Sequence, residues 1–79
     1  MSLSENNIND ISPVQNLTNL ETLLFEHNEV SDISSLVSNT GLGKGDRIFM
    51  KDNNLDLSDD SQDMKNIQTL IDRGCRVGY

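Results

Sequence analysis

The sequence predicts an α/β fold built from repeats, in which short parallel strands alternate with helical segments. One spacing of apolar residues around an asparagine occurs three times: Leu3-x-x-Asn6-x-Ile8, Leu20-x-x-Leu23-x-Phe25-x-x-Asn28-x-Val30 and Ile48-x-Met50-x-x-Asn53-x-Leu55. The asparagines are 22 and 25 residues apart, and a fixed period of this length is typical of stacked repeats. A single longer amphipathic pattern over residues 61–73, followed by a short apolar stretch, completes the prediction.

Each repeat is expected to contain a short strand followed by a buried asparagine. Leu23 and Phe25 are two residues apart, so they point to the same face of a strand. We expect parallel strands near residues 2–4, 23–25, 48–50 and 75–77, with Cys75 and Val77 opposite Ile48 and Met50. The amide of asparagine both donates and accepts. A stack of Asn6, Asn28 and Asn53 would therefore satisfy turn backbone groups that water cannot reach.

The returning side of each coil is predicted to be a short helix. Asp10-Ile11-Ser12-Pro13 reads as a turn or a helix start, and the same device returns as Asp32-Ile33-Ser34-Ser35. Apolar residues three apart after each turn suit one or two turns of 3₁₀ or α-helix.

These motifs carry a resemblance to a known family. The spacing L-x-x-L-x-L-x-x-N-x-I/V is the leucine-rich repeat pattern. The D-I-x-P/S-L/V turn is similar to the 22-residue repeats of bacterial internalins and of the phosphatase-regulatory SDS22-like group. The resemblance covers residues 2–57. It implies a right-handed solenoid with a parallel sheet on its concave side, a surface that this family uses to grip proteins, and a parent protein that is secreted or on the cell surface.

The chain is expected to divide into leucine-rich repeats at 1–57, with a truncated first coil, and a C-terminal cap at 58–79. Met64, Ile67, Leu70 and Ile71 form the apolar stripe of the cap helix, which leaves Asn66 exposed, and Gly74 suits the position after its end. The run from Gly41 onward resembles terminal units of bacterial leucine-rich repeat proteins. The resemblance therefore implies the C-terminal piece of a longer array.

Composition excludes some classes of partner. The formal net charge is −7, and all six basic residues fall after residue 43 without forming a cluster. Such a chain is not expected to bind nucleic acid or anionic membranes, and no apolar run approaches the ~20 residues of a membrane-spanning helix. Cys75 is the only cysteine and is expected to be a small buried hydrophobe.

No cofactor and no catalytic residue are predicted, so the chain is not expected to be an enzyme. The segment Asp52-x-Asn54-x-Asp56-x-Ser58-x-Asp60-x-x-Asp63 has oxygen groups at the positions of a Ca²⁺-binding EF-hand loop, but Leu57 stands where that loop needs glycine. The three glycines at 41, 43 and 45 have the wrong spacing for a phosphate-binding loop and predict a widened turn. His27 is the only histidine and is assigned to the surface.

The remaining candidate is the outward face of the sheet. Parallel stacking is expected to place Leu24 beside Phe49, with Ser2 and Arg76 flanking that pair. An apolar centre with a charged rim is typical of an interface. The predicted partner-binding residues are Thr22, Leu24, Glu26, His27, Arg47, Phe49, Lys51 and Arg76.

The predicted function is non-enzymatic protein–protein recognition through this concave sheet, with a protein partner whose identity the sequence does not specify. One alternative is a purely structural C-terminal cap for an array whose binding surface lies upstream. A second alternative is a Ca²⁺-binding turn at 52–63. Residues 1–17 are also expected to support self-association, because an open strand edge and apolar side chains there have no coil to cover them.

Overall fold

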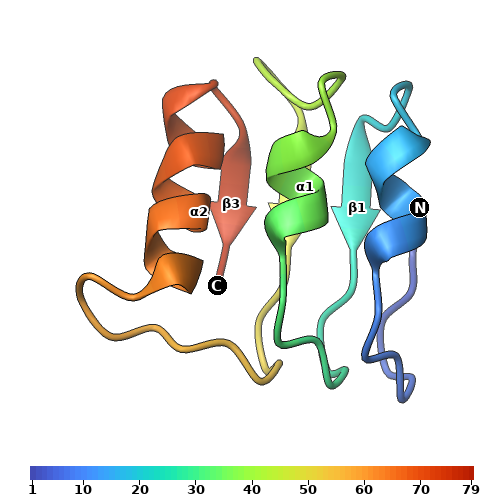
Figure 1. Ribbon diagram of the computed structural model, residues 1–79. Coiled ribbons are helices and arrows are strands. Elements are labelled where there is room, and N and C mark those ends of the chain that lie inside the picture. Colours follow the sequence, from blue (N-terminus) through green and yellow to red (C-terminus); the bar gives the residue numbers. More distant parts are fainter.

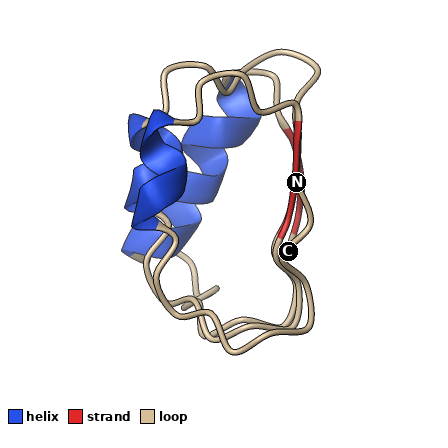
Figure 2. Cartoon of the chain, turned by 90° about the vertical axis from the view of Figure 1, so that its right-hand side faces the viewer, coloured by secondary structure: helices blue, strands red, loops and turns tan.

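The computed structural model describes residues 1–79 and contains a layer of strands packed against a layer of helices (Figure 1). The elements along the chain are the 3₁₀ helix η1 (Ser12–Asn16), β1 (Thr22–Leu24), α1 (Ser34–Ser38), β2 (Arg47–Phe49), α2 (Gln62–Asp72) and β3 (Arg76–Gly78). Figure 2 shows the helices on one side of the molecule and the strands on the other, joined by loops at both ends. No helix is both long enough and apolar enough to cross a membrane.

The three strands form one parallel sheet in the order β1-β2-β3. Thr22 pairs with Arg47, and Leu24 pairs with Phe49, as the repeat spacing predicts. Ser2 adds a single parallel bridge to Leu24 at the outer edge of β1. The strand predicted at residues 2–4 is reduced to this one bridge. The other three strands begin one residue away from their predicted positions. The sheet and the flanking helices are compatible with a leucine-rich repeat fold.

The register of β3 corrects one prediction. Val77 pairs with Ile48, and Gly78 pairs with Phe49, so Cys75 lies before the strand and not opposite Ile48. The reason is the end of α2, where the amide of Gly74 (φ 98°) bonds the Ile71 carbonyl and the amide of Cys75 bonds the Leu70 carbonyl. This pattern is a Schellman motif. Cys75 therefore completes the helix end before the chain becomes a strand.

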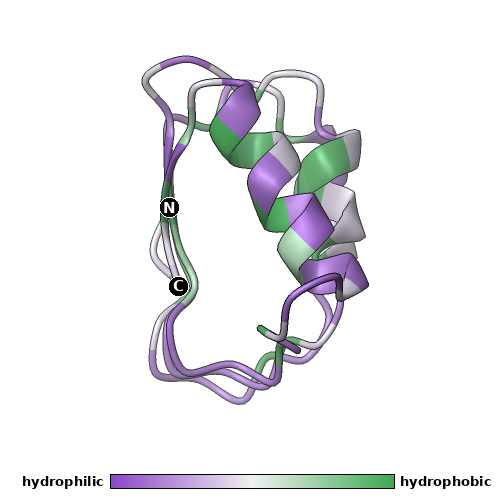
Figure 3. Cartoon of the chain, turned by 90° about the vertical axis from the view of Figure 1, so that its left-hand side faces the viewer, coloured by the Kyte–Doolittle hydropathy of each residue, from purple (hydrophilic) through white to green (hydrophobic).

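The hydrophobic core lies between the sheet and the helices. Thirteen apolar residues are buried there, and they come from every coil: Ile11, Val14, Leu23, Phe25, Val30, Ile33, Leu36, Leu42, Ile48, Met50, Ile67, Leu70 and Cys75. The turns that follow the strands are hydrophilic (Figure 3). Each coil contributes only a few of these residues, so the core forms by stacking of coil on coil.

The helix α2 begins at a side-chain cap and presents one apolar face. Ser61 Oγ accepts a hydrogen bond from the Met64 amide at 3.1 Å, as expected of an N-cap serine. The predicted stripe is partly wrong. Asn66 is buried and accepts a hydrogen bond from Gln62 Nε2 at 3.1 Å, whereas Ile71 is 37% exposed. The face of α2 that meets the core is therefore rotated slightly from the predicted one.

Candidate functional site

The outward side of the three strands is the first candidate site, and we call it the sheet face. Its residues are Thr22, Leu24, Arg47, Phe49, Arg76 and Gly78. Leu24 and Phe49 are in-register neighbours at its centre and are both half-buried. A Cβ atom added to Gly78 would lie 2.5 Å from Cδ1 of Phe49, so the aromatic ring extends over Gly78. The predicted flanking of this pair by Arg76 is wrong, because Arg76 pairs with Arg47 one row away.

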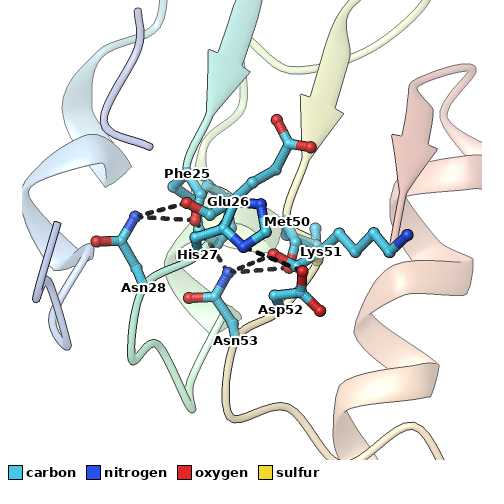
Figure 4. Close-up of polar contacts among 8 residues, drawn as sticks. All are labelled: Phe25, Glu26, His27, Asn28, Met50, Lys51, Asp52 and Asn53. Atoms are coloured by element: carbon cyan, nitrogen blue, oxygen red, sulfur yellow. Dashed lines mark hydrogen bonds and ion pairs between the residues drawn. The ribbon is translucent and has the colours of Figure 1, made fainter. Parts of the chain in front are cut away.

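The charged residues of the sheet face lie beside its apolar centre. Arg47 and Arg76 are adjacent and exposed. Glu26 and Lys51 follow β1 and β2, and Figure 4 shows the Lys51 side chain extending away from Glu26. His27 Nδ1 lies 3.0 Å from Asp52 Oδ2, between half-exposed side chains of neighbouring turns. Glu26 and Lys51, which follow neighbouring strands, form no ion pair with each other.

The turns below the strands are bonded to one another through asparagine side chains, and we call this region the turn edge (Figure 4). Asn28 Nδ2 donates to the carbonyls of Leu3, Phe25 and Glu26 at 2.8–3.2 Å. Asn28 Oδ1 accepts from the amides of Asn6 and Ile8 at 3.2 and 3.1 Å. One buried side chain therefore satisfies five backbone groups of two coils.

Asn53 does the same for the next pair of coils. Its Nδ2 donates to the carbonyls of Phe25 and Met50 at 2.9 Å, and its Oδ1 accepts from the Val30 amide at 3.0 Å. Asn6 is exposed, contrary to the predicted buried stack, and its side chain donates only to carbonyls of its own turn, at Leu3 and Ser4. The Asn28 and Asn53 side chains therefore join neighbouring coils, and the Asn6 side chain does not.

The residue before each of these asparagines adopts a left-handed backbone conformation. Glu5, His27 and Asp52 have φ values of 60°, 59° and 62°. This conformation is uncommon for residues other than glycine, with asparagine, aspartate and histidine the main exceptions. It turns the chain so that the following amide side chain points back under the strands. His27 and Asp52 are therefore brought together by a repeating backbone feature.

An Asp-x-Ser turn opens the return of all three coils. The carboxylates of Asp10, Asp32 and Asp56 each accept from the amide two residues further on, at 2.8–3.0 Å. Hydrogen bonds from that serine hold the pKa of each carboxyl below its ordinary value. Stabilisation from these bonds is complete above the ordinary Asp pKa and is lost as the pH falls through the lowered one.

The third of these turns and its surroundings use three of the five aspartates at 52–63. The Asp56 carboxylate accepts a hydrogen bond from the Ser58 amide, and Asp63 Oδ2 accepts one from the Asp56 amide at 2.8 Å. Asp52 contacts His27 of the neighbouring turn. No three His, Cys, Asp or Glu side chains lie together in a way that would hold a metal ion. Three of the five carboxylates in this segment therefore bond the turn to itself or to its neighbour, whereas Asp59 and Asp60 make no side-chain hydrogen bond.

Cys75 and Asn39 lie at the opposite end of the coils from the turn edge. Cys75 is buried and its Sγ contacts the Gly43 carbonyl at 3.5 Å. Burial, with the nearby Asp46 carboxylate, raises the pKa of the Cys75 thiol, so the reactive thiolate is disfavoured. This environment is that of a packing residue.

Asn39 is a structural residue that the repeat pattern did not predict. It is fully buried, and its Nδ2 donates to the carbonyls of Val14 and Leu17 at 2.9 and 3.1 Å. Its Oδ1 accepts from the Gly41 amide at 2.9 Å. The position one 22-residue period earlier holds Leu17, so the template gave no reason to expect a polar residue here. The only signal was an asparagine just before the glycine-rich turn.

Residues 1–38 match a protein family described as Leucine Rich repeats (2 copies). The match covers the coils of η1, β1 and α1, just under half of the chain, and it supports a leucine-rich repeat protein. Repeats of this kind generally mediate protein–protein interactions. No curated protein and no solved structure matches the chain.

Proposed function

We propose that this chain is a non-enzymatic protein-recognition module that binds its partner through the sheet face. The pairing of Leu24 with Phe49 on the open side of the sheet carries the proposal. Apolar side chains at the centre of a patch with polar residues around them are the usual anatomy of a protein interface. The contact residues would be the eight predicted ones. Among them, His27 is held next to the sheet face by its contact with Asp52.

The architecture in this proposal is a right-handed solenoid of the internalin-like or SDS22-like subtype, with the sheet face on its concave side. Parallel strands in register, a match to leucine-rich repeats over 1–38 and the returning Asp-x-Ser turns support it. The carboxylates that would otherwise be candidates for acid–base chemistry accept turn amides, which favours binding over catalysis.

A photocrosslinking experiment tests the proposed function. A benzophenone side chain placed at Arg47 on the sheet face should give adducts with a specific protein in extracts of the source cells. The same group at Lys65, an exposed position on α2, is the matched control and should not. Adducts formed equally well from both positions, or only from Lys65, would contradict recognition through the sheet face.

A structural C-terminal cap is the second candidate function, and the contacts of α2 favour it. Ile67 and Leu70 cover one end of the core, and Arg73 donates to the carbonyl of Val37 at 2.7 Å at the end of α1. If residues 58–79 act only as a cap, crosslinking from β2 should find no partner while Leu70→Ala still destabilises the fold. The Ca²⁺ alternative would require Ca²⁺ to raise the melting temperature, and we expect no change.

Self-association through residues 1–17 is part of the same proposal. Leu3 and Ile8 pack on the core but are only half-buried, and Met1 and Leu17 are 52% and 39% exposed. A second copy stacking on this side would cover them. Sedimentation should show a concentration-dependent dimer that Leu17→Lys weakens, whereas a dimer unaffected by Leu17→Lys would place the contact elsewhere.

A further inference from the structure

The sheet face is locally positive although the chain as a whole is strongly acidic. The formal net charge is −7, with only six basic residues. Three of these six lie near Phe49: Arg47 and Lys51 stand two residues before and two residues after it, and Arg76 pairs with Arg47 on the neighbouring strand. Glu26, after β1, is the acidic residue of the same side. Half of the basic residues of the protein therefore lie near the half-buried ring of Phe49.

The two arginines of this group have no partner in the fold. Arg47 and Arg76 are paired in register on neighbouring strands, which places their Cα atoms about 4.8 Å apart. Their guanidinium groups make neither a hydrogen bond nor an ion pair with any other group of the protein. Arg73, by contrast, donates to the carbonyls of Val37 and Asn39. Like charges directly opposite each other destabilise a sheet, and an external anion would remove that repulsion.

We propose that the sheet face recognises an extended acidic segment of a protein partner in which an Asp or Glu stands two residues from an apolar side chain. This inference rests on the proposed function and specifies its partner. Outward positions two residues apart in a strand are separated by about 6.6 Å, and an extended peptide has the same repeat. A carboxylate held by Arg47 and Arg76 therefore places the apolar side chain over Leu24 and Phe49.

The guanidinium geometry favours this ligand. Each planar fork offers parallel N–H donors that match the two oxygens of a carboxylate. A nucleic acid or a phosphorylated segment would also match, but each brings more negative charge toward Glu26 and toward a molecule of net charge −7. A single carboxylate gains the arginine contacts with the least repulsion, so the structure favours an acidic peptide.

Nuclear magnetic resonance titration of the ¹⁵N-labelled chain tests the inference. The probe is a blocked five-residue peptide with glutamate at its second position, phenylalanine at its fourth and serine elsewhere. Matched peptides carry glutamine, lysine or phosphoserine in place of glutamate. The glutamate peptide should shift the amides of Arg47, Phe49 and Arg76, and its binding should weaken as salt rises because exposed charges are screened.

Two double variants of equal charge change complete the test. Arg47→Gln/Arg76→Gln should weaken binding of the glutamate peptide about tenfold, the loss of one strong charge-assisted contact. Lys44→Gln/Lys65→Gln, which changes exposed lysines away from the sheet face, should change it less than about twofold. Two melting curves establish that both variants are folded.

The outcomes separate this inference from the proposed function. Equal binding of the glutamine peptide at the sheet face, or binding of the phosphoserine peptide alone, would overturn the acidic-peptide inference and leave recognition by the face intact. An absence of shifts with all four peptides would also overturn the inference. Shifts confined to α1 and α2 would contradict both.

Discussion

Asn28 and the pair Arg47 and Arg76 show two opposite uses of polar side chains in one small protein. At the turn edge, Asn28 is buried and bonds five backbone groups of its own coil and the coil before it. On the sheet face, Arg47 and Arg76 stand side by side with no bonded partner. The polar groups that hold coils together point inward and are satisfied, and those that remain available point outward from the sheet.

Asn28 therefore belongs to the residues that maintain the fold, whereas the side chains of Arg47 and Arg76 make no bond within it. Removing an inward polar group leaves buried amides and carbonyls unpaired, at a cost of ~1–3 kcal/mol. Removing an outward one leaves nothing unpaired, because the group had no partner. Substitutions at the turn edge should therefore lower the free energy of unfolding, and substitutions of the two arginines on the sheet face should not. Substitutions in the core should lower it the most.

Substitutions in the core should cause the largest losses in the free energy of unfolding. Leu36 is fully buried between α1 and the sheet, so Leu36→Ala should lower the free energy of unfolding by about 2–5 kcal/mol through lost burial and a residual cavity. Leu57→Ala, at a side chain that is 48% exposed, should cost at most about 0.5 kcal/mol. Urea melts of both variants check this, and similar losses would mean that the core does not lie where described.

Substitutions at the turn edge should give the next largest losses in the free energy of unfolding. Asn28→Ala should cost about 1–3 kcal/mol because five backbone groups lose a partner, and Asn53→Ala should cost less because Asn53 is only half-buried. Asn9→Ala is the control, since its exposed side chain bonds nothing, and should cost at most about 0.5 kcal/mol. Equal costs at Asn28 and Asn9 would remove the turn edge from the stabilising parts of the molecule.

The Asp-x-Ser turns should make stability depend on pH on the acid side. Lowered carboxyl pKa values mean that the unfolded chain binds protons more readily, so stability should fall as the pH drops below about 4. Replacing Asp10, Asp32 and Asp56 together by asparagine should flatten this decline in melting temperature. Asp59→Asn, at an exposed residue without a side-chain hydrogen bond, should leave it unchanged.

The repeat period predicted the parts of the molecule that recur, and missed the parts that occur once. The spacing of Leu23, Phe25 and Asn28 located the strands and the register of β1 with β2. It placed β3 within one residue but gave it the wrong register, because that register follows from the helix end at Gly74. It also gave no signal for Asn39, where a buried amide takes the place of Leu17 in the previous coil. Single tertiary contacts of this kind have no period to reveal them.

Two glycines allow a further comparison between the sheet face and the packed interior. At Gly78→Ala the added Cβ would press on the Phe49 ring, which would have to shift, so the cost should be about 1–3 kcal/mol. At Gly41→Ala the added Cβ would meet the backbone of Thr18, which cannot move alone, and the cost should be clearly larger. Calorimetry of the two variants checks the order, and the reverse order would contradict the described packing.

The most direct measurement compares the free energies of unfolding of Arg47→Thr/Arg76→Thr and of Asn28→Ala under the same conditions. Threonine suits a strand, and the substitution removes two adjacent like charges that bond nothing in the fold. The free energy of unfolding of the double arginine variant should therefore lie within about 0.5 kcal/mol of that of the unaltered protein, whereas Asn28→Ala should lower it by about 1–3 kcal/mol. A loss in the arginine variant as large as that of Asn28→Ala would show that the sheet face maintains the fold, and would contradict its assignment as a surface kept free for a partner.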